Sequence, residues 1–90
     1  DYSLIFRSEF IVKPIIEVYS KKGCHLCEIL IEQLYQLVSD RAEIKINDIE
    51  ESNYLLEKYK TRIPVVRYQG RTLFQYHLDS FIIEEILNQQ

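Results

Sequence analysis

The spacing of apolar residues changes along the chain and divides it into short segments of different type. Residues 15–19 form an apolar run that ends in the polar stretch 20–23, which indicates a strand followed by a turn. From Cys24 the apolar residues recur every three or four positions, which predicts a helix that ends near residues 39–40. The apolar face of that helix consists of Cys27, Leu30, Ile31, Leu34, Leu37 and Val38.

The middle of the chain carries a second strand and a second helix. Residues 43–47 alternate between polar and apolar, which is typical of a strand with two different faces. Residues 52–53 are Ser-Asn and can cap a helix over residues 54–59. Pro64 has no N–H to donate inside a central ladder, so it marks the first residue of a strand that continues over residues 65–68.

The last third of the chain predicts a hairpin and a helix. Residues 69–71 form a tight turn, residues 72–76 return as the partner strand, and Asp79 and Ser80 cap a helix over 81–87. The order is therefore β-α-β-α-β-β-α. Because β-α-β crossovers are right-handed and join parallel strands, we expect an α/β fold with a mixed four-stranded sheet flanked by helices.

The beginning of the chain does not fit this plan. We divide the chain into an N-terminal extension, residues 1–14, whose structure the pattern does not predict, and one domain over residues 15–90. The apolar run over residues 2–19 is interrupted by charged side chains, so it is not a secretory signal. The sequence starts at Asp1 and contains no methionine. We expect a cytoplasmic protein, or an organellar one if a targeting peptide was removed upstream of Asp1.

Composition and charge narrow the choice of partners. A hydrophobic content of 47% with 28% charged residues is ordinary for a soluble globular protein. The net charge of −3 gives no general attraction to nucleic acid. No stretch reaches the roughly 18 apolar residues that a membrane-spanning helix needs. We expect a monomer that binds neither nucleic acid nor a membrane.

The only two cysteines, Cys24 and Cys27, stand as a CxxC pair where the first predicted helix begins. A small protein held together by disulfides normally carries four or more cysteines. We therefore expect this pair to be functional rather than structural, and the protein to reside in a reducing compartment. A helix start stabilises an anion, and the thiolate is the reactive form of cysteine. Residues three apart on a helix lie about 5–6 Å apart at Cβ, a separation from which a disulfide closes with small adjustment.

The two cysteines are assigned different roles. Cys24, at the helix end, is the predicted nucleophile, and Cys27, one turn deeper, is the resolving thiol that breaks the mixed disulfide. Lys21, Lys22 and a protonated His25 are expected to help the helix start hold the pKa of the Cys24 thiol below its ordinary value of about 8.5. Since a more acidic thiolate is also a weaker nucleophile, the larger benefit is that Cys24 becomes a better leaving group.

Several short motifs together resemble the glutaredoxin-like domain family, within the thioredoxin-fold superfamily. They are residues 23–28, with the CxxC, residues 59–66, with the Ile-Pro step, then Gly70 and residues 78–79. The resemblance covers residues 15–87. It implies a thioredoxin-like β-α-β-α-β-β-α fold and a thiol–disulfide oxidoreductase.

The same resemblance implies a substrate site beside the cysteines. The peptide bond before Pro64 is expected to be cis, and the backbone of Ile63 would then bind an extended thiol substrate like an added strand. Arg62, together with Lys60 and Lys21, would receive a carboxylate. The expected partners are a disulfide-containing protein or small thiol substrate and a thiol reductant system.

This chain also departs from the family pattern. His25 and Leu26 replace Pro-Tyr between the cysteines, and Tyr76 and His77 stand where relatives carry a Gly-Gly pair that lies against the γ-glutamyl group of glutathione. We therefore expect no bound cofactor, and glutathione to be a poor or moderate reductant.

Two other functions stay open at this point. The chain can be a non-catalytic interaction module with a vestigial CxxC, or an iron–sulfur or metal carrier. A metal site needs about four ligands, and His25 and His77 are the only histidines, so we predict no metal site within one chain. Glu17, inside an apolar strand, is either a buried proton acceptor for Cys27 or a residue at an edge or facing solvent, and we favour the second.

Overall fold

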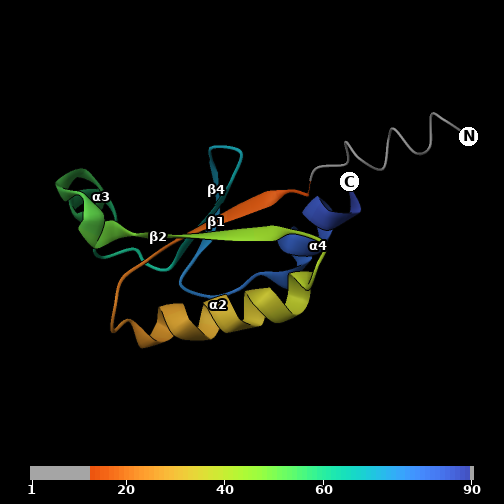
Figure 1. The fold of residues 1–90 in the computed structure, drawn as a ribbon, viewed down its shortest axis with the longest axis horizontal. Coiled ribbons are helices and arrows are strands. Elements are labelled where there is room, and N and C mark those ends of the chain that lie inside the picture. Colours follow the sequence, from red (N-terminus) through yellow and green to blue (C-terminus); the bar gives the residue numbers. More distant parts are fainter. Residues whose placement is uncertain (1–12, 90) are drawn as a thin grey trace, which may run out of the picture.

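The computed structural model of the chain describes residues 13–89 and shows a mixed sheet with helices on both faces (Figure 1). The elements are β1 (Ile15–Ser20), α2 (His25–Val38), β2 (Glu43–Asp48), η1 (Ile49–Glu51, a 3₁₀ turn), α3 (Asn53–Tyr59), β3 (Val65–Tyr68), β4 (Arg71–Gln75) and α4 (Ser80–Asn88). The described residues form a four-stranded sheet of order β2-β1-β3-β4. β1 is parallel to β2 and antiparallel to β3, and β3 is antiparallel to β4. The predicted thioredoxin-like architecture is confirmed.

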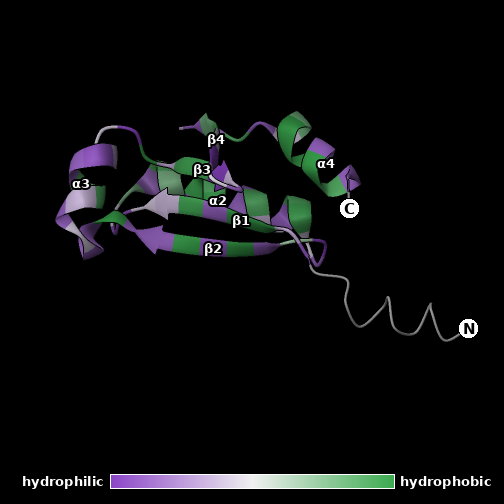
Figure 2. Cartoon of the chain, turned by 90° about the horizontal axis from the view of Figure 1, so that it is seen from above, coloured by the Kyte–Doolittle hydropathy of each residue, from purple (hydrophilic) through white to green (hydrophobic). Residues whose placement is uncertain are grey.

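One face of the sheet carries the main core. Successive strand residues point to opposite faces, so Ile16 and Val18 of β1 share a face with their β3 partners Tyr68 and Val66. Buried side chains of α2 and α4 pack against this face: Leu30, Leu34, Val38, Ile83, Ile86 and Leu87. Figure 2 shows the resulting alternation of hydrophobic and hydrophilic positions along the strands. The apolar stripe read from the sequence is therefore what fixes α2 to the sheet.

Within residues 13–89, helices cover the opposite face at one end only. The seven-residue helix α3 and the η1 turn bury Ile49, Tyr59 and Val65 there, with Tyr19 packed beside them. Figure 1 shows α3 at the end of the molecule where α2 begins. Both lie at this end because β1 and β2 are parallel and the two helices follow their carboxyl ends. This arrangement places α3 near the cysteine pair.

The predicted helix caps are confirmed at two positions. The hydroxyl of Ser52 accepts the N–H of Leu55 at 3.0 Å. The carboxylate of Asp79 accepts the N–H groups of Phe81 and Ile82 at 3.1 and 3.3 Å. Each bond satisfies donors that a helix leaves unpaired in its first turn. The 3₁₀ turn η1 was not predicted.

The hairpin differs from the prediction by one residue. The turn consists of Gln69 and Gly70, with φ of 51° and 79°, and positive φ at both central residues is the two-residue hairpin turn whose twist suits the strands. β4 therefore covers Arg71–Gln75 rather than residues 72–76. Tyr76 leaves the extended conformation, with φ of 68°.

The predicted N-terminal extension, residues 1–14, falls almost wholly outside the described residues, so its boundary stays a prediction. Within residues 13–89, the helices are all too short or too polar to cross a membrane.

Candidate functional site

The cysteine pair follows a tight turn that leads from β1 into α2. The N–H of Cys24 donates to the carbonyl of Lys21 at 3.2 Å. Gly23 occupies the third position of this turn with φ of 80°, the left-handed geometry that type II turns require and that favours glycine. The turn thus reverses the chain and delivers Cys24 to the start of the helix.

Cys24 is the N-cap residue of α2, and its sulfur acts as the capping group. The Sγ atom accepts the N–H of Cys27 at 3.1 Å, and the Cys24 carbonyl accepts the N–H of Glu28 at 3.1 Å. The sulfur therefore occupies the position that a serine or aspartate oxygen takes in ordinary caps. Partial positive charge from the helix N-terminus is directed at it, which favours an anionic sulfur.

The two sulfurs are bonded to each other, and the two residues differ in exposure. Cys24 and Cys27 form a disulfide with their Cα atoms 5.2 Å apart, inside the usual range of about 4.4–6.8 Å. Cys24 is partly exposed, whereas Cys27 is 1% exposed. A partner can reach Cys24, and Cys27 stands behind it. This is the arrangement expected of a nucleophile and its resolving thiol.

Sheet register brings the Ile-Pro step to the same end of the sheet as the cysteines. Tyr19 of β1 lies opposite Val65 of the antiparallel strand β3. We call residues 61–64 the proline loop. The turn after Ser20 and the proline loop therefore lie at the same end of the sheet. The Ile63–Pro64 peptide is cis, as the resemblance implied. The CxxC and the Ile-Pro step are about 40 residues apart in sequence but lie at the same end of the sheet in the fold.

Ile63 has main-chain groups without hydrogen-bond partners at this end of the sheet. Its side chain is partly exposed and Pro64 is buried. Among residues 13–89, neither the N–H nor the carbonyl of Ile63 makes a hydrogen bond. An extended segment of another chain can use such groups as the start of a ladder.

The charged residues predicted for the site are all at the surface. Lys21, His25 and Arg62 are exposed. His25 Nδ1 lies 3.8 Å from Glu28 Oε2, with the two side chains 86% and 67% exposed, so this pair contributes little. Lys21 and Arg62 make no ion pair with any of residues 13–89. Their predicted roles in tuning Cys24 and receiving a carboxylate stay predictions.

An aromatic pair supports the proline loop from α3. The rings of Tyr19 and Tyr59 stack with centroids 4.7 Å apart, and the Tyr59 carbonyl accepts the N–H of Arg62 at 2.8 Å. Arg67 Nη1 donates to the Tyr59 hydroxyl at 2.9 Å. Burial raises the pKa of Tyr19, and the charge of Glu17 and the neighbouring Tyr59 raise it further, so this phenol is neutral at physiological pH.

Glu17 lies on the wrong face of the sheet to serve Cys27. It alternates with Ile16 and Val18, which face α2, and it is partly exposed. Its carboxylate accepts a hydrogen bond from the Asn47 side chain at 3.3 Å. The favoured alternative, a residue outside the core, agrees with the structure.

Sequence reasoning missed the contacts of Tyr76, which it had singled out only for its bulk. The Tyr76 hydroxyl donates to the Thr61 carbonyl at 2.8 Å, and the Tyr76 N–H donates to the Pro64 carbonyl at 2.8 Å. No local pattern signals a hydrogen bond between residues so far apart. The structure therefore adds Tyr76 and Thr61 to the surroundings of the site.

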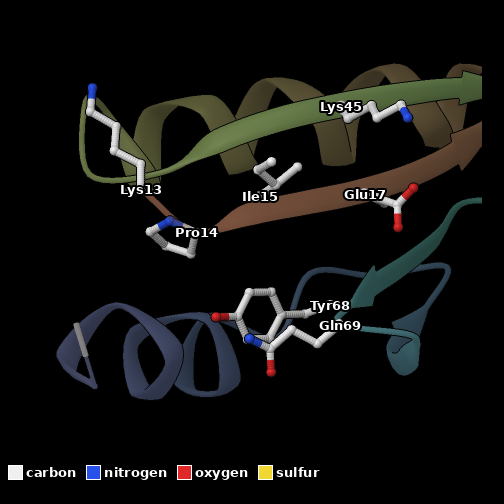
Figure 3. Close-up of a pocket in the computed structure, with 7 residues that line it drawn as sticks. All are labelled: Lys13, Pro14, Ile15, Glu17, Lys45, Tyr68 and Gln69. Carbon is white, nitrogen blue, oxygen red and sulfur yellow. The ribbon is translucent and has the colours of Figure 1, made fainter. Parts of the chain in front are cut away.

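One hollow of the surface lies away from the cysteines. It measures about 460 Å³ and is lined by Lys13, Pro14, Ile15, Glu17, Lys45, Tyr68 and Gln69 (Figure 3). These residues cluster around the start of β1, whereas Cys24 follows its end, so the hollow is separate from the redox pair. In the described part of the chain, no group of three or more His, Cys, Asp or Glu side chains is placed to hold a metal ion.

Comparison with known proteins agrees with this geometry. The profile of the family described as "Glutaredoxin-like domain (DUF836)" matches residues 15–89. The solution structure of protein Ne2328 from Nitrosomonas europaea is 30% identical, with a TM-score of 0.73, over 84% of this chain and 93% of that chain. The solution structure of protein XcR50 from X. campestris is 26% identical, with a TM-score of 0.65, over 83% of this chain and 94% of that chain. No curated protein matches the chain.

The exposure difference between the cysteines generates a labelling prediction. After reduction, iodoacetamide is expected to modify Cys24 well before Cys27, because Cys27 is buried and Cys24 is not. The rate of Cys24 modification should rise with a pH midpoint below about 8.5, the pKa of an unperturbed thiol, since the helix start stabilises the thiolate. Peptide mapping by mass spectrometry over a pH series measures both, and Cys24→Ser should remove the fast phase. Equal labelling of the two cysteines would contradict the assignment of roles.

Proposed function

The chain belongs to the glutaredoxin-like domain family, and on that premise we propose that it is a thiol–disulfide oxidoreductase that reduces protein or small-molecule disulfides. The observation that carries the proposal is the capping geometry of Cys24. A partly exposed sulfur accepts an N–H at a helix N-terminus, with a second, buried sulfur one turn behind it.

The proposed reaction has two exchange steps. The Cys24 thiolate attacks one sulfur of a substrate disulfide, forms a mixed disulfide and releases the first substrate thiolate. Cys27 loses its proton and attacks Cys24 Sγ, which closes the Cys24–Cys27 disulfide and releases the second thiolate. The substrate takes up two electrons and two protons, and the protein ends in the oxidised state that the structure describes. A thiol reductant system returns it to the dithiol.

The helix start contributes to both directions of the exchange. It lowers the free energy of the Cys24 thiolate by about 0.3–2 kcal/mol. A lower pKa raises the fraction of thiolate but weakens each thiolate as a nucleophile, so the gain in attack is small. A lower pKa also makes the Cys24 thiolate a better leaving group, and no loss of nucleophilicity offsets this second effect. Mixed disulfides at Cys24 should therefore exchange quickly.

The proline loop is the proposed substrate-binding element. Ile63 would pair through its main chain with the residues beside the substrate cysteine, against the surface of Pro64. Arg62 and Lys21, whose side chains form no ion pair within residues 13–89, would meet a carboxylate on the substrate. These assignments are part of the proposal.

Two serine substitutions test the exchange mechanism. Cys24→Ser is expected to abolish disulfide reduction, because no other thiol is exposed in the site. Cys27→Ser should keep the first step but stall as a mixed disulfide that a mass spectrum of the intact protein detects. Turnover that survives Cys24→Ser would contradict the proposal, and so would failure of Cys27→Ser to trap substrate when Cys24 remains reactive toward iodoacetamide.

A charge substitution tests the carboxylate site. Arg62→Gln is expected to lower kcat/KM for a disulfide peptide with an aspartate beside the cysteine by about two- to fivefold, the scale of an exposed ion pair. The same peptide with asparagine in that place should be unaffected. Arg71→Gln is a matched control, because Arg71 is exposed at the hairpin end of β4, far from the proline loop. An equal effect on the two peptides would remove Arg62 from the binding site.

The reductant is tested by supplying the oxidised protein with glutathione or with a thioredoxin-based reducing system. Glutathione is expected to be the poorer of the two, because Tyr76 and His77 fill the place of the relatives' glycines. Replacing both by glycine should raise the rate with glutathione, and glycine suits the positive φ of residue 76. Rapid, saturable reduction of the unsubstituted protein by glutathione would contradict this expectation.

A further inference from the structure

We propose that Tyr76 is a positioning residue that holds the proline loop, residues 61–64, in the form that binds an extended polypeptide disulfide. The inference rests on the proposed function and deepens it, since it names the element that selects the substrate class. It is built on two hydrogen bonds and on the backbone conformation of Tyr76 itself.

The two hydrogen bonds tie one residue to both ends of the loop. The Tyr76 hydroxyl donates to the carbonyl of Thr61 at 2.8 Å, and the Tyr76 main-chain N–H donates to the carbonyl of Pro64 at 2.8 Å. The first and last residues of the loop are thereby fixed to a single residue, which directly follows β4. The side-chain bond is the part that a substitution can remove without disturbing the main-chain bond.

α3 fixes the same loop from the opposite side. The N–H of Arg62 donates to the carbonyl of Tyr59 at 2.8 Å, and Tyr59 is buried and stacked on Tyr19. Between these attachments lies Ile63, whose main-chain groups make no hydrogen bond within residues 13–89. The loop is thus restrained on each side of Ile63, whose N–H and carbonyl are both unpaired within residues 13–89.

The backbone at Tyr76 is held in an uncommon conformation to make this contact. Tyr76 has φ of 68°, and the N–H of His77 bonds the carbonyl of Gln75 at 2.7 Å, which together describe a γ-turn of the rare positive-φ form. A bulky residue seldom adopts positive φ. The turn directs the chain away from β4 while the tyrosine ring reaches back to Thr61, with 40% of the residue exposed.

The arrangement favours one class of substrate. A polypeptide disulfide that pairs with Ile63 needs the loop at a fixed distance from Cys24, since near-attack geometry is sensitive to small displacements. A small disulfide without a peptide backbone makes no such pairing and needs only access to the sulfur. Loss of the Tyr76 hydroxyl should therefore separate the two kinds of substrate.

The experiment compares Tyr76→Phe with the wild type and with Tyr35→Phe, the same chemical change at an exposed position late in α2. Each reduced protein is oxidised by a disulfide-linked peptide with mid-chain cysteines, and separately by bis(2-hydroxyethyl) disulfide. For Tyr76→Phe we expect the second-order rate constant with the peptide to fall about two- to tenfold, the scale of one neutral hydrogen bond. The small disulfide and Tyr35→Phe should show no change.

Amide hydrogen exchange tests the restraint without any substrate. In Tyr76→Phe, exchange at the Arg62 amide should accelerate by a similar factor, about two- to tenfold, while the amides of α2 keep their protection.

Unchanged exchange, or an equal fall in rate for the peptide and the small disulfide, would overturn the inference. If the wild type reacts with neither disulfide, the proposed function itself fails and the inference falls with it. That result is recognisable because the unsubstituted protein is already inert.

Discussion

The hydrogen bond from the Cys27 N–H to Cys24 Sγ is the interaction on which the site depends. It exists because Cys24 sits at the N-cap rather than inside the helix, and that placement is set by the turn in which Gly23 adopts positive φ. A thiol one position later would lie within the first turn and lose the cap geometry. The chemistry of the pair therefore follows from a local backbone constraint rather than from an enclosed cavity.

The rest of the fold supplies the rigidity and the second half of the site. Buried residues such as Leu30 and Leu34 pack α2 against the sheet, which holds its N-terminus at the end of β1. The register that pairs Tyr19 with Val65 brings the proline loop to the end of the sheet where α2 begins. Among residues 13–89, the short helix α3 covers the other face at this end. The second, smaller core thus lies next to the candidate site.

Local patterns predict the elements that have local causes. The period of the apolar residues locates α2, the capping residues Ser52 and Asp79 locate α3 and α4, and the CxxC locates the candidate site. The cis peptide before Pro64 and the pairing of distant motifs came only from the resemblance. The Tyr76 contact was not predictable, because it joins residues 15 apart in sequence through a backbone conformation that tyrosine rarely adopts.

Comparing magnitudes shows what the Tyr76 contact contributes. A non-glycine residue held at positive φ costs on the order of 1–3 kcal/mol, and each of the two hydrogen bonds that Tyr76 donates returns about 0.5–1.5 kcal/mol. The cost and the combined return nearly cancel, so these contacts do little for the free energy of unfolding. The consequence that we propose is geometric: the hydrogen bond restrains the carbonyl of Thr61 and, through the chain, the position of Ile63. In these two proposals, the ring of Tyr76 hinders glutathione and its hydroxyl fixes the loop, so the two effects belong to separable parts of one side chain.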